Sequence, residues 1–324
     1  MAIPTLSVRV NKITREADDI YSYELVDPAG EALPGFSAGA HVDVHTPAGI
    51  VRQYSLSNDA GETHRYVVAI QREPQSRGGS KSLVDQVKEG QTITISAPRN
   101  NFPVDRAAGR HVLIAGGIGI TPILAMTRQL AAANADYKLY YIARTPEKMA
   151  FQAVLKGREF AGHIELIFDG GDPSKGLDVK KLLATRADGT HVYCCGPTGL
   201  MNAVKEAAKQ SYPEDSVHME YFTAEPIAAE AGRRQNKPFK IKVKSSGKEF
   251  EVPADKSILD VLRANGFDLD SSCEEGICGT CATQVVEGEI EHRDLFLTEK
   301  AKREGKWMMI CISRAKGDTL TIDL

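Results

Sequence analysis

Short runs in which apolar and polar residues alternate fill the first third of the chain. Alternation with a period of two is typical of strands that bury one face, and turn-forming residues separate these runs. The predicted strands are 6–10, 20–25, 41–45, 66–70 and 91–96. One helix is predicted at 81–87, because Ser80 can cap its start and Gly90 follows its end. The pattern predicts a small antiparallel β-barrel over residues 1–107.

The pattern changes after residue 107, where longer apolar runs alternate with helical stretches. The predicted strands are 111–115, 138–143, 163–168, 191–195 and 216–219. Helices are predicted between them, one ending near Ala133 and the others at 149–155, 178–184 and 199–210. Strands that alternate with helices form a parallel sheet, which binds ligands at the carboxyl ends of its strands. We therefore expect an α/β ligand-binding domain at 108–225.

The last third begins after a segment with little apolar periodicity, which predicts a linker at 226–237. Beyond it, the runs 239–243 and 248–252 predict a hairpin. Ser257 then caps a helix, with Asp260 at the capping-box distance and Gly266 as its C-cap. Final strands are predicted at 283–287 and 319–324. Together these elements predict a small mixed α+β domain at 238–324.

Composition narrows the classes of protein that this chain can belong to. Its 324 residues predict two or three domains, and a net charge of −3 offers no basic stripe for nucleic acid. The N-terminus lacks the organisation of a secretory signal. The longest apolar stretch, 112–127, is too short and too interrupted by glycine to span a bilayer. We expect a cytoplasmic protein with neither a membrane nor a nucleic-acid partner.

Four cysteines carry the most specific chemical signal. Cys273, Cys278, Cys281 and Cys311 are separated by gaps of four, two and twenty-nine residues. This spacing is that of plant-type 2Fe–2S clusters, in which four cysteine thiolates hold two irons. Small neighbours, among them Gly276 and Gly279, would let backbone N–H groups turn towards the cluster sulfides.

Three alternatives to a cluster stay open. Structural zinc usually pairs two C-x₂-C motifs, and only Cys278 and Cys281 form one here. A disulfide framework lacks a secretory context, and free buried thiols are the remaining alternative.

The adjacent Glu274 and Glu275 are predicted to be either part of a docking patch or simply solvated. A one-electron carrier also implies a source of electrons elsewhere in the chain.

Two features of the predicted barrel suit a phosphate-bearing ligand. Alternation places Arg52 and Tyr54 on one face of a strand, with Ser55 beside them at the strand end. A guanidinium suits a phosphate, a phenol suits a ring, and a hydroxyl can donate to a ring nitrogen. Gly78, Gly79 and Ser80 follow Arg77 directly before the predicted helix, where backbone N–H groups are free to bind phosphate. The alternatives are a polar strand edge for the first feature and a flexible turn with an N-cap for the second.

Two further motifs lie at the carboxyl ends of predicted parallel strands. The first is Gly116, Gly117 and Gly119, which lacks the G-x-G-x-x-G spacing of the usual dinucleotide motif. The second is Cys194-Cys195-Gly196-Pro197, with Pro197 placed to start a helix. We interpret Cys194 as a packing residue, whereas Cys195 either packs or faces a bound ring.

These motifs, in this order, resemble the phthalate dioxygenase reductase family over essentially the whole chain. The resemblance implies a flavin barrel, a nicotinamide domain and a β-grasp ferredoxin domain in succession. The motifs are Arg52-x-Tyr54-Ser55, Gly78-Gly79-Ser80, Gly116-Gly117-Ile118-Gly119-Ile120-Thr121-Pro122, Cys194-Cys195-Gly196-Pro197, Glu220-x-Phe222 and the four cysteines. One departure is Thr223, where such reductases often carry glycine.

The resemblance also implies cofactors and roles for individual residues. Arg52 and the backbone of Gly79 and Ser80 would hold the phosphate of FMN, Tyr54 would lie along the flavin, and Ser55 would bond near its N5. The glycines 116, 117 and 119 would admit the pyrophosphate of NADH. Thr121 and Cys195 would lie near the nicotinamide, and Phe222 would cover the flavin until nicotinamide displaces it.

The predicted function is transfer of electrons from NADH, through FMN and the 2Fe–2S cluster, to a Rieske-type oxygenase. A flavin accepts a hydride and releases electrons singly, which connects a two-electron donor to a one-electron cluster. The alternatives are a stand-alone NADH:acceptor reductase and, outside the enzymes, a zinc-bound interaction module.

Overall fold

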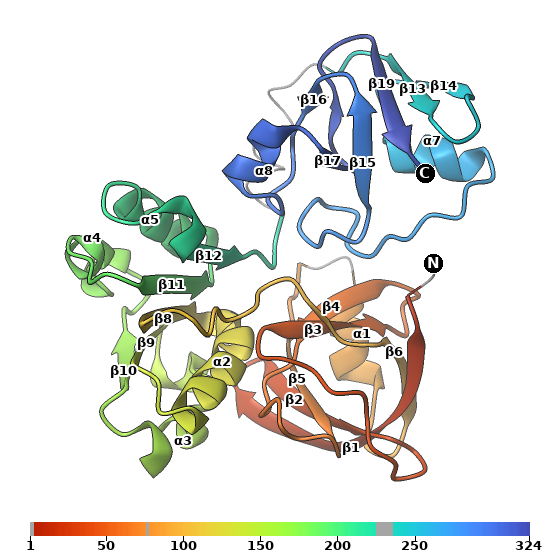
Figure 1. Ribbon diagram of the computed structural model, residues 1–324. Coiled ribbons are helices and arrows are strands. Elements are labelled where there is room, and N and C mark those ends of the chain that lie inside the picture. Colours follow the sequence, from red (N-terminus) through yellow and green to blue (C-terminus); the bar gives the residue numbers. More distant parts are fainter. Residues whose placement is uncertain (1–2, 76–77, 225–235) are drawn as a thin grey trace. The chain divides into compact units, whose positions relative to one another are not determined.

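The computed structural model describes residues 3–75, 78–224 and 236–324. Its contacts divide the chain into two compact units, Pro4–Glu220 and Tyr221–Leu324, the second of which also includes Ile3. Figure 1 shows the elements of both units. Arg77 and most of the predicted linker lie outside the described residues.

The first part of the larger unit is an antiparallel sheet that closes on itself. Its strand order is β4-β3-β6-β1-β2-β5, with β7 beside β3. An antiparallel bridge between Leu56 and Val68 joins the residue after β4 to β5, so the sheet forms a barrel. The strands are β1 Thr5–Ala17, β2 Ile20–Val26, β3 Ala40–His45, β4 Val51–Ser55, β5 Tyr66–Gln71, β6 Thr92–Ser96 and β7 Arg99–Asn100. All five strands predicted from the alternation are present, and alternate residues such as Val8, Val10, Val42 and Val44 fill the barrel core.

The single helix of this barrel, α1 Gly79–Gln86, begins two residues earlier than predicted. Its N-cap residue is Gly78, whose φ of 103° is a left-handed conformation that glycine adopts freely. Ser80 lies inside the first turn, where its hydroxyl accepts a hydrogen bond of 3.2 Å from the backbone N–H of Glu73. The prediction that Ser80 caps the helix is therefore wrong.

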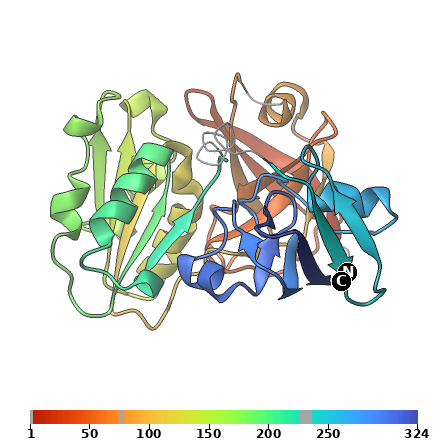
Figure 2. The same ribbon diagram turned by 90° about the horizontal axis from the view of Figure 1, so that it is seen from above.

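The second part of the larger unit is a parallel sheet with strand order β10-β9-β8-β11-β12. Its strands are β8 Arg110–Gly116, β9 Tyr137–Ala143, β10 Ile164–Phe168, β11 Thr190–Cys195 and β12 Val217–Glu220, and all match the predicted positions. Helix α2, Ile120–Ala132, packs on one face, while α4, Val179–Leu183, and α5, Thr198–Ala208, lie on the other (Figures 1 and 2). The one-turn 3₁₀ segment Gly117–Gly119 joins β8 to α2.

The other helices of this part are shorter than predicted. The predicted helix 149–155 is reduced to α3 Gln152–Leu155, because Phe151 before it has a left-handed φ of 57°. Helices α4 Val179–Leu183 and α5 Thr198–Ala208 begin after Asp178 and Pro197, which occupy their N-cap positions. The Asp178 carboxylate accepts a hydrogen bond from the N–H of Lys181, as a capping aspartate does.

Within the larger unit, the barrel and the parallel sheet share one hydrophobic core. Ala17, Ile20 and Phe102 from the barrel side belong to the same buried cluster as Ile120 and Met126 of α2. Fully burying an aliphatic side chain stabilises a fold by about 1.5–3 kcal/mol, so this shared cluster joins the two parts firmly.

The smaller unit is an α+β fold around a five-stranded sheet with order β14-β13-β19-β15-β17 and a separate pair, β16-β18. Its elements are β13 Phe239–Val243, β14 Glu249–Val252, α7 Ile258–Ala264, β15 Ala282–Glu287, β16 Ile290–Glu291, α8 Glu299–Glu304, β17 Trp307–Met309, β18 Arg314–Ala315 and β19 Thr319–Asp323. The predicted capping box is confirmed, since the side chains of Ser257 and Asp260 each accept a hydrogen bond from the other's backbone N–H. The C-cap residue is Asn265, and Gly266 follows it with a φ of 85°.

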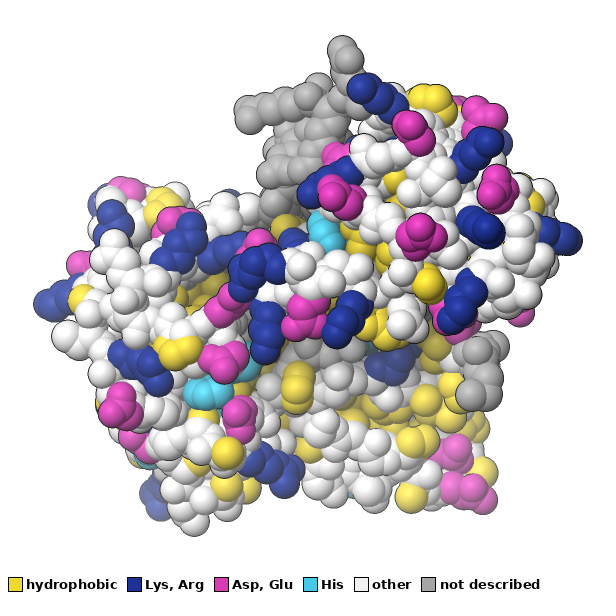
Figure 3. Space-filling view, turned by 45° about the horizontal axis from the view of Figure 1, so that its top comes forward, with side chains coloured by type: hydrophobic (Ala, Val, Ile, Leu, Met, Phe, Trp, Pro, Cys, Tyr) yellow, Lys and Arg dark blue, Asp and Glu magenta, His cyan; other side chains and the backbone are white. Residues whose placement is uncertain are grey.

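Charged side chains of both signs are interspersed on the face shown in Figure 3. This mixture agrees with the near-neutral composition of the chain. Among the described helices, none has the length and apolarity that crossing a membrane requires.

Candidate functional site

The predicted phosphate site is assembled from β4 and the start of α1. Arg52 is half-buried on β4, and its side chain lies against Gly79, the first residue of α1. A Cβ built on Gly79 would lie 2.9 Å from Cγ and 3.3 Å from Nε of Arg52. Gly79 therefore leaves the space that brings a guanidinium beside the start of a helix. A cationic fork and the backbone N–H groups of a helix start together fit a phosphate.

Ser55, at the end of β4, is joined to a residue that received no role from the sequence. Its hydroxyl donates a hydrogen bond of 3.4 Å to Oε2 of Glu220, the last residue of β12. Burial raises the pKa of the Glu220 carboxyl from its ordinary value of 4.5 to about 8. Glu220 therefore holds a proton at neutral pH, next to the hydroxyl predicted to face a flavin. Burial also raises the pKa of Tyr54, the residue before Ser55.

The glycine-rich loop after β8 packs against the loop after β11. A Cβ on Gly116 would lie 2.6 Å from Cδ of Pro197, and one on Gly119 would lie 2.2 Å from the Cys195 carbonyl oxygen. A Cβ on Gly196 would lie 3.0 Å from Gly116. Gly117, with a φ of 53°, is the member of the loop whose Cβ position meets nothing within 4 Å. Two of the three loop glycines are thus required by backbone packing, and Gly117 leaves open space.

Two buried hydroxyls hold this loop in place. The Thr121 hydroxyl, 2% exposed at the start of α2, donates to the carbonyl of Ile118 at 3.1 Å. The Tyr141 hydroxyl donates to the carbonyl of Gly117 at 3.1 Å and accepts from the N–H of Ala150 at 3.2 Å. Tyr141 is fully buried, so both partners would lose a hydrogen bond without it.

Cys195 and Phe222 have contrasting environments. The Cys195 thiol has no exposed area and belongs to the core cluster, as the packing alternative predicts. Burial and the nearby Glu220 raise its pKa, so it is not a thiolate. Cys194 is equally buried, as expected of a packing residue. Phe222 belongs to the smaller unit, where its ring is 39% exposed.

In the smaller unit the four predicted ligands form two thiol pairs. Cys273 is hydrogen-bonded to Cys278, and Cys281 is hydrogen-bonded to Cys311. No three His, Cys, Asp or Glu side chains in the described part of the chain group around a single metal ion. Two thiol pairs fit a centre with two irons, each of which takes two cysteine sulfurs.

The hydrogen bond within each thiol pair favours the thiolate form of one of its two members. The N–H of Glu275 donates to Sγ of Cys273 at 3.3 Å. A hydrogen bond from Cys273 lowers the pKa of Cys278 to about 6. A hydrogen bond from Cys311 likewise lowers the pKa of Cys281. The same hydrogen bonds raise the pKa of Cys273 and of Cys311, so one thiol in each pair ionises more readily than the other. Thiolates are the form that binds iron.

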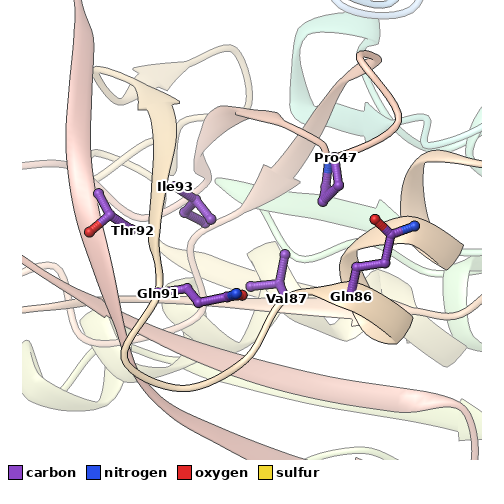
Figure 4. A pocket seen from close by; sticks show the side chains of 6 residues that line it. All are labelled: Pro47, Gln86, Val87, Gln91, Thr92 and Ile93. Atoms are coloured by element: carbon purple, nitrogen blue, oxygen red, sulfur yellow. The ribbon is translucent and has the colours of Figure 1, made fainter.

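A pocket of about 400 Å³ lies elsewhere on the barrel (Figure 4). It is lined by Pro47, Gln86, Val87, Gln91, Thr92 and Ile93. Gln86 ends α1, whereas Arg52 lies at the start of that helix, so this pocket is separate from the predicted phosphate site.

Sequence reasoning missed the residues that position the predicted ligands. Glu220 was visible only as part of the Glu220-x-Phe222 motif, and its partner Ser55 is 165 residues away. The role of Tyr141 left no signal, because a tyrosine in an apolar strand is typical of a core. A further pair, Arg263 and Glu274, forms an ion pair of 2.7 Å beside the thiol loop. Glu274 is exposed, and this ion pair gives its carboxylate a partner.

Comparisons with known proteins agree with this architecture. Residues 241–316 match the family described as the 2Fe-2S iron-sulfur cluster binding domain. The chain is 44% identical, over 98% of its length and 100% of the relative, to a vanillate O-demethylase oxidoreductase of Pseudomonas sp. (strain HR199 / DSM 7063). It is 43% identical, over 98% of its length and 97% of the relative, to the phthalate dioxygenase reductase of Burkholderia cepacia. A solved structure of phthalate dioxygenase reductase matches with a TM-score of 0.73 and 42% identity, covering 99% of this chain and 98% of that one.

The barrel, the parallel sheet and the cysteine loop define an iron–sulfur flavoprotein oxidoreductase. Its relatives include reductase subunits of oxygenase systems. The chain belongs to the phthalate dioxygenase reductase family.

Proposed function

We propose that this reductase takes a hydride from NADH and delivers the two electrons singly to a Rieske-type oxygenase, either phthalate dioxygenase-like or demethylase-like. The observation that carries the proposal is the arrangement of Cys273, Cys278, Cys281 and Cys311 as two pairs with N–H donors around them. Plant-type clusters have potentials near about −400 mV and Rieske clusters lie at roughly −150 to +300 mV, so this transfer runs downhill.

The roles proposed for residues of the larger unit are those that the family resemblance implies. Arg52 and the backbone at Gly78, Gly79 and Ser80 would hold the phosphate of FMN, and Tyr54 would lie along its ring system. When bound, FMN supplies the chemistry of accepting electrons as a pair and releasing them singly. The packed position of Arg52 against Gly79 supports this role.

Ser55 and Glu220 would together hold a proton close to the flavin. Ser55 would bond near N5, and Glu220 holds a proton at its carboxyl near neutral pH, because its pKa is about 8. The hydrogen bond between them supports a joint role.

NADH would bind at the carboxyl edge of the parallel sheet. Gly116, Gly117 and Gly119, fixed by Thr121 and Tyr141, would receive its pyrophosphate. The remaining nicotinamide-site residues are Cys195, Gly196 and Pro197, and Phe222 would cover the flavin until nicotinamide arrives. The open space at Gly117 supports this placement, whereas the burial of Cys195 means that contact with a ring requires its neighbours to move.

We also propose domain bounds of 1–107, 108–225 and 238–324, with a linker at 226–237, in a cytoplasmic protein. The two sheets of the larger unit and the separate sheet of the smaller one support this division.

An anaerobic NADH titration of the purified protein tests the function. We expect bleaching of flavin absorbance followed by the EPR signal of a reduced 2Fe–2S cluster, with FMN released on denaturation. Oxidised iron in the presence of excess NADH would contradict the proposal. A second assay, in air and with a purified Rieske oxygenase added, distinguishes a stand-alone reductase, which would reduce O₂ to peroxide equal to the NADH consumed whether or not an oxygenase is present.

A further inference from the structure

The loop between Cys273 and Cys281 uses left-handed backbone at three positions, and one of them is not glycine. Gly276 and Gly279 have φ values of 74° and 76°, which glycine adopts at no steric cost. Glu274, next to the ligand Cys273, has a φ of 56°. A non-glycine residue held in this region costs about 1 kcal/mol or more, so its surroundings must hold it there.

The residue that holds Glu274 is Arg263, from the last turn of α7. Its Nη1 binds Oε1 of Glu274 at 2.7 Å. Its Nη2 binds the carbonyl of Leu269 at 3.0 Å and the hydroxyl of Ser271 at 2.5 Å. The Ser271 hydroxyl also donates to Oε1 of Glu274 at 2.6 Å. The guanidinium thus binds both the segment that leads into the cluster loop, at Leu269 and Ser271, and the side chain of Glu274 inside the loop.

The turn at Glu274 determines what its neighbours can bind. A left-handed residue reverses the direction of the N–H that follows, and successive N–H groups in such turns create an anion-binding concavity. The next N–H, that of Glu275, donates to Sγ of Cys273 at 3.3 Å. The bond between Arg263 and Glu274 therefore supports an N–H···S contact to a cluster ligand.

Helix α7 connects this loop to the distant ligand as well. Near its start, the N–H of Leu259 donates to the carbonyl of Ile310 at 3.1 Å, one residue before Cys311. The capping box of Ser257 and Asp260 fixes that end of the helix. One short helix is thus bonded at its start to the segment carrying Cys311 and at its end to the loop carrying Cys273.

We infer that Arg263 is a positioning residue for the iron–sulfur centre, acting through the left-handed turn at Glu274 on the N–H···S bond to Cys273. Hydrogen bonds to ligand sulfurs set the reduction potential of such clusters, and loss of outer partners weakens metal binding. Without Arg263 the turn relaxes, the sulfur loses its donor, and the cluster becomes easier to remove and harder to reduce.

The test measures cluster loss to a chelator, by visible absorbance, and the midpoint potential, by anaerobic redox titration of the full-length protein. Arg263→Gln is expected to speed cluster loss by about 10-fold or more and to shift the potential in the negative direction. Arg263→Lys keeps the charge but cannot span all three acceptors, so it should resemble Arg263→Gln. Wild-type behaviour of the lysine variant would overturn the inference in favour of charge alone.

Glu274→Gly gives a control that separates positioning from a general loss of structure. Glycine adopts the turn without help, so this variant should lose its cluster at close to the wild-type rate. Adding Arg263→Gln to Glu274→Gly should then have no further effect, whereas Glu274→Ala should lose the cluster quickly. An equal effect of Arg263→Gln in both backgrounds, or rapid loss from Glu274→Gly alone, would overturn the inference.

The inference rests on the cluster assignment, and the same experiment tells the two apart. Wild-type protein without acid-labile sulfide would contradict the cluster itself. A normal cluster that is insensitive to Arg263→Gln would contradict only the role of Arg263. Reduction of the flavin by NADH in each variant checks that the larger unit is intact.

Discussion

The hydroxyl of Ser55 and the carboxyl of Glu220 are hydrogen-bonded at 3.4 Å, although 165 residues separate them in the chain. Each is the last residue of its strand, one in the barrel and one in the parallel sheet. The pair therefore joins the predicted flavin site to the predicted nicotinamide site within one compact unit.

Replacing Glu220 with glutamine should change how stability depends on pH. The pKa of Glu220 is about 8 in the folded protein and 4.5 ordinarily, so the folded state binds the extra proton between these values. Its favourable contribution is complete below pH 4.5 and is lost as the pH rises through about 8. The free energy of unfolding of wild type, relative to Glu220→Gln, should fall by about 5 kcal/mol across this window.

Denaturant unfolding of the flavin-stripped protein, at several pH values, measures this difference. Stripping the flavin keeps cofactor release from contributing to the transition. Parallel pH profiles for the two proteins would show that the carboxyl titrates normally.

Replacing Gly79 with alanine should weaken FMN binding. The new Cβ would lie 2.9 Å from Cγ of Arg52 and would displace the guanidinium from the start of α1. Loss of one charged phosphate contact raises the dissociation constant by roughly tenfold or more, since a hydrogen bond to a charged group is worth about 1.5–3 kcal/mol. Flavin fluorescence measures the constant. Gly35→Ala is the matched control, because nothing lies within 4 Å of its Cβ position.

Replacing Tyr141 with phenylalanine should weaken NADH binding more than it slows hydride transfer. The carbonyl of Gly117 and the N–H of Ala150 would both lose a buried partner, at a stability cost of about 1–3 kcal/mol. Stopped-flow reduction of the flavin separates the apparent dissociation constant of NADH from the limiting rate. The neighbouring Tyr140→Phe, on the other sheet face, should leave both unchanged; equal effects would mean that the hydroxyl has no special role.

Replacing Cys278 with serine should abolish reduction of one-electron protein acceptors and leave reduction of the flavin by NADH largely intact. Cys278 is paired with Cys273, and both lie in the smaller unit, away from the barrel and the parallel sheet in sequence. Cytochrome c reduction and anaerobic flavin bleaching measure the two activities. Cys194→Ala serves as the control, since that buried thiol belongs to the parallel sheet. Loss of both activities in Cys278→Ser would contradict separate electron-transfer modules.

Much of the fold could be predicted because local patterns and tertiary packing agree. The alternating and continuous apolar runs located the predicted strands of both sheets in the larger unit, and the capping box at Ser257 and Asp260 formed as predicted. Ser80 failed as a cap because Gly78 before it adopts the left-handed conformation that starts the helix earlier. In the run Gly78-Gly79-Ser80, the sequence does not reveal which residue caps the helix.

The candidate site was predictable where one residue type meets one chemical need, as the cysteines do. The site was not predictable where function depends on burial or on contacts between residues that only the folded chain brings together. The raised pKa of Glu220 arises from burial, and the turn at Glu274 depends on an arginine eleven residues earlier. Neither a buried carboxyl nor a left-handed glutamate has a sequence signature.

The contact between the loops that contain Gly116 and Gly196 limits which substitutions the proposed nucleotide-binding edge of the parallel sheet can accept. Because the two backbones are this close, neither loop can accept a larger residue at its glycine unless the other loop moves. A change of dinucleotide preference at this edge would therefore require paired substitutions in segments about eighty residues apart, or else changes confined to the neighbouring strands β9 and β10.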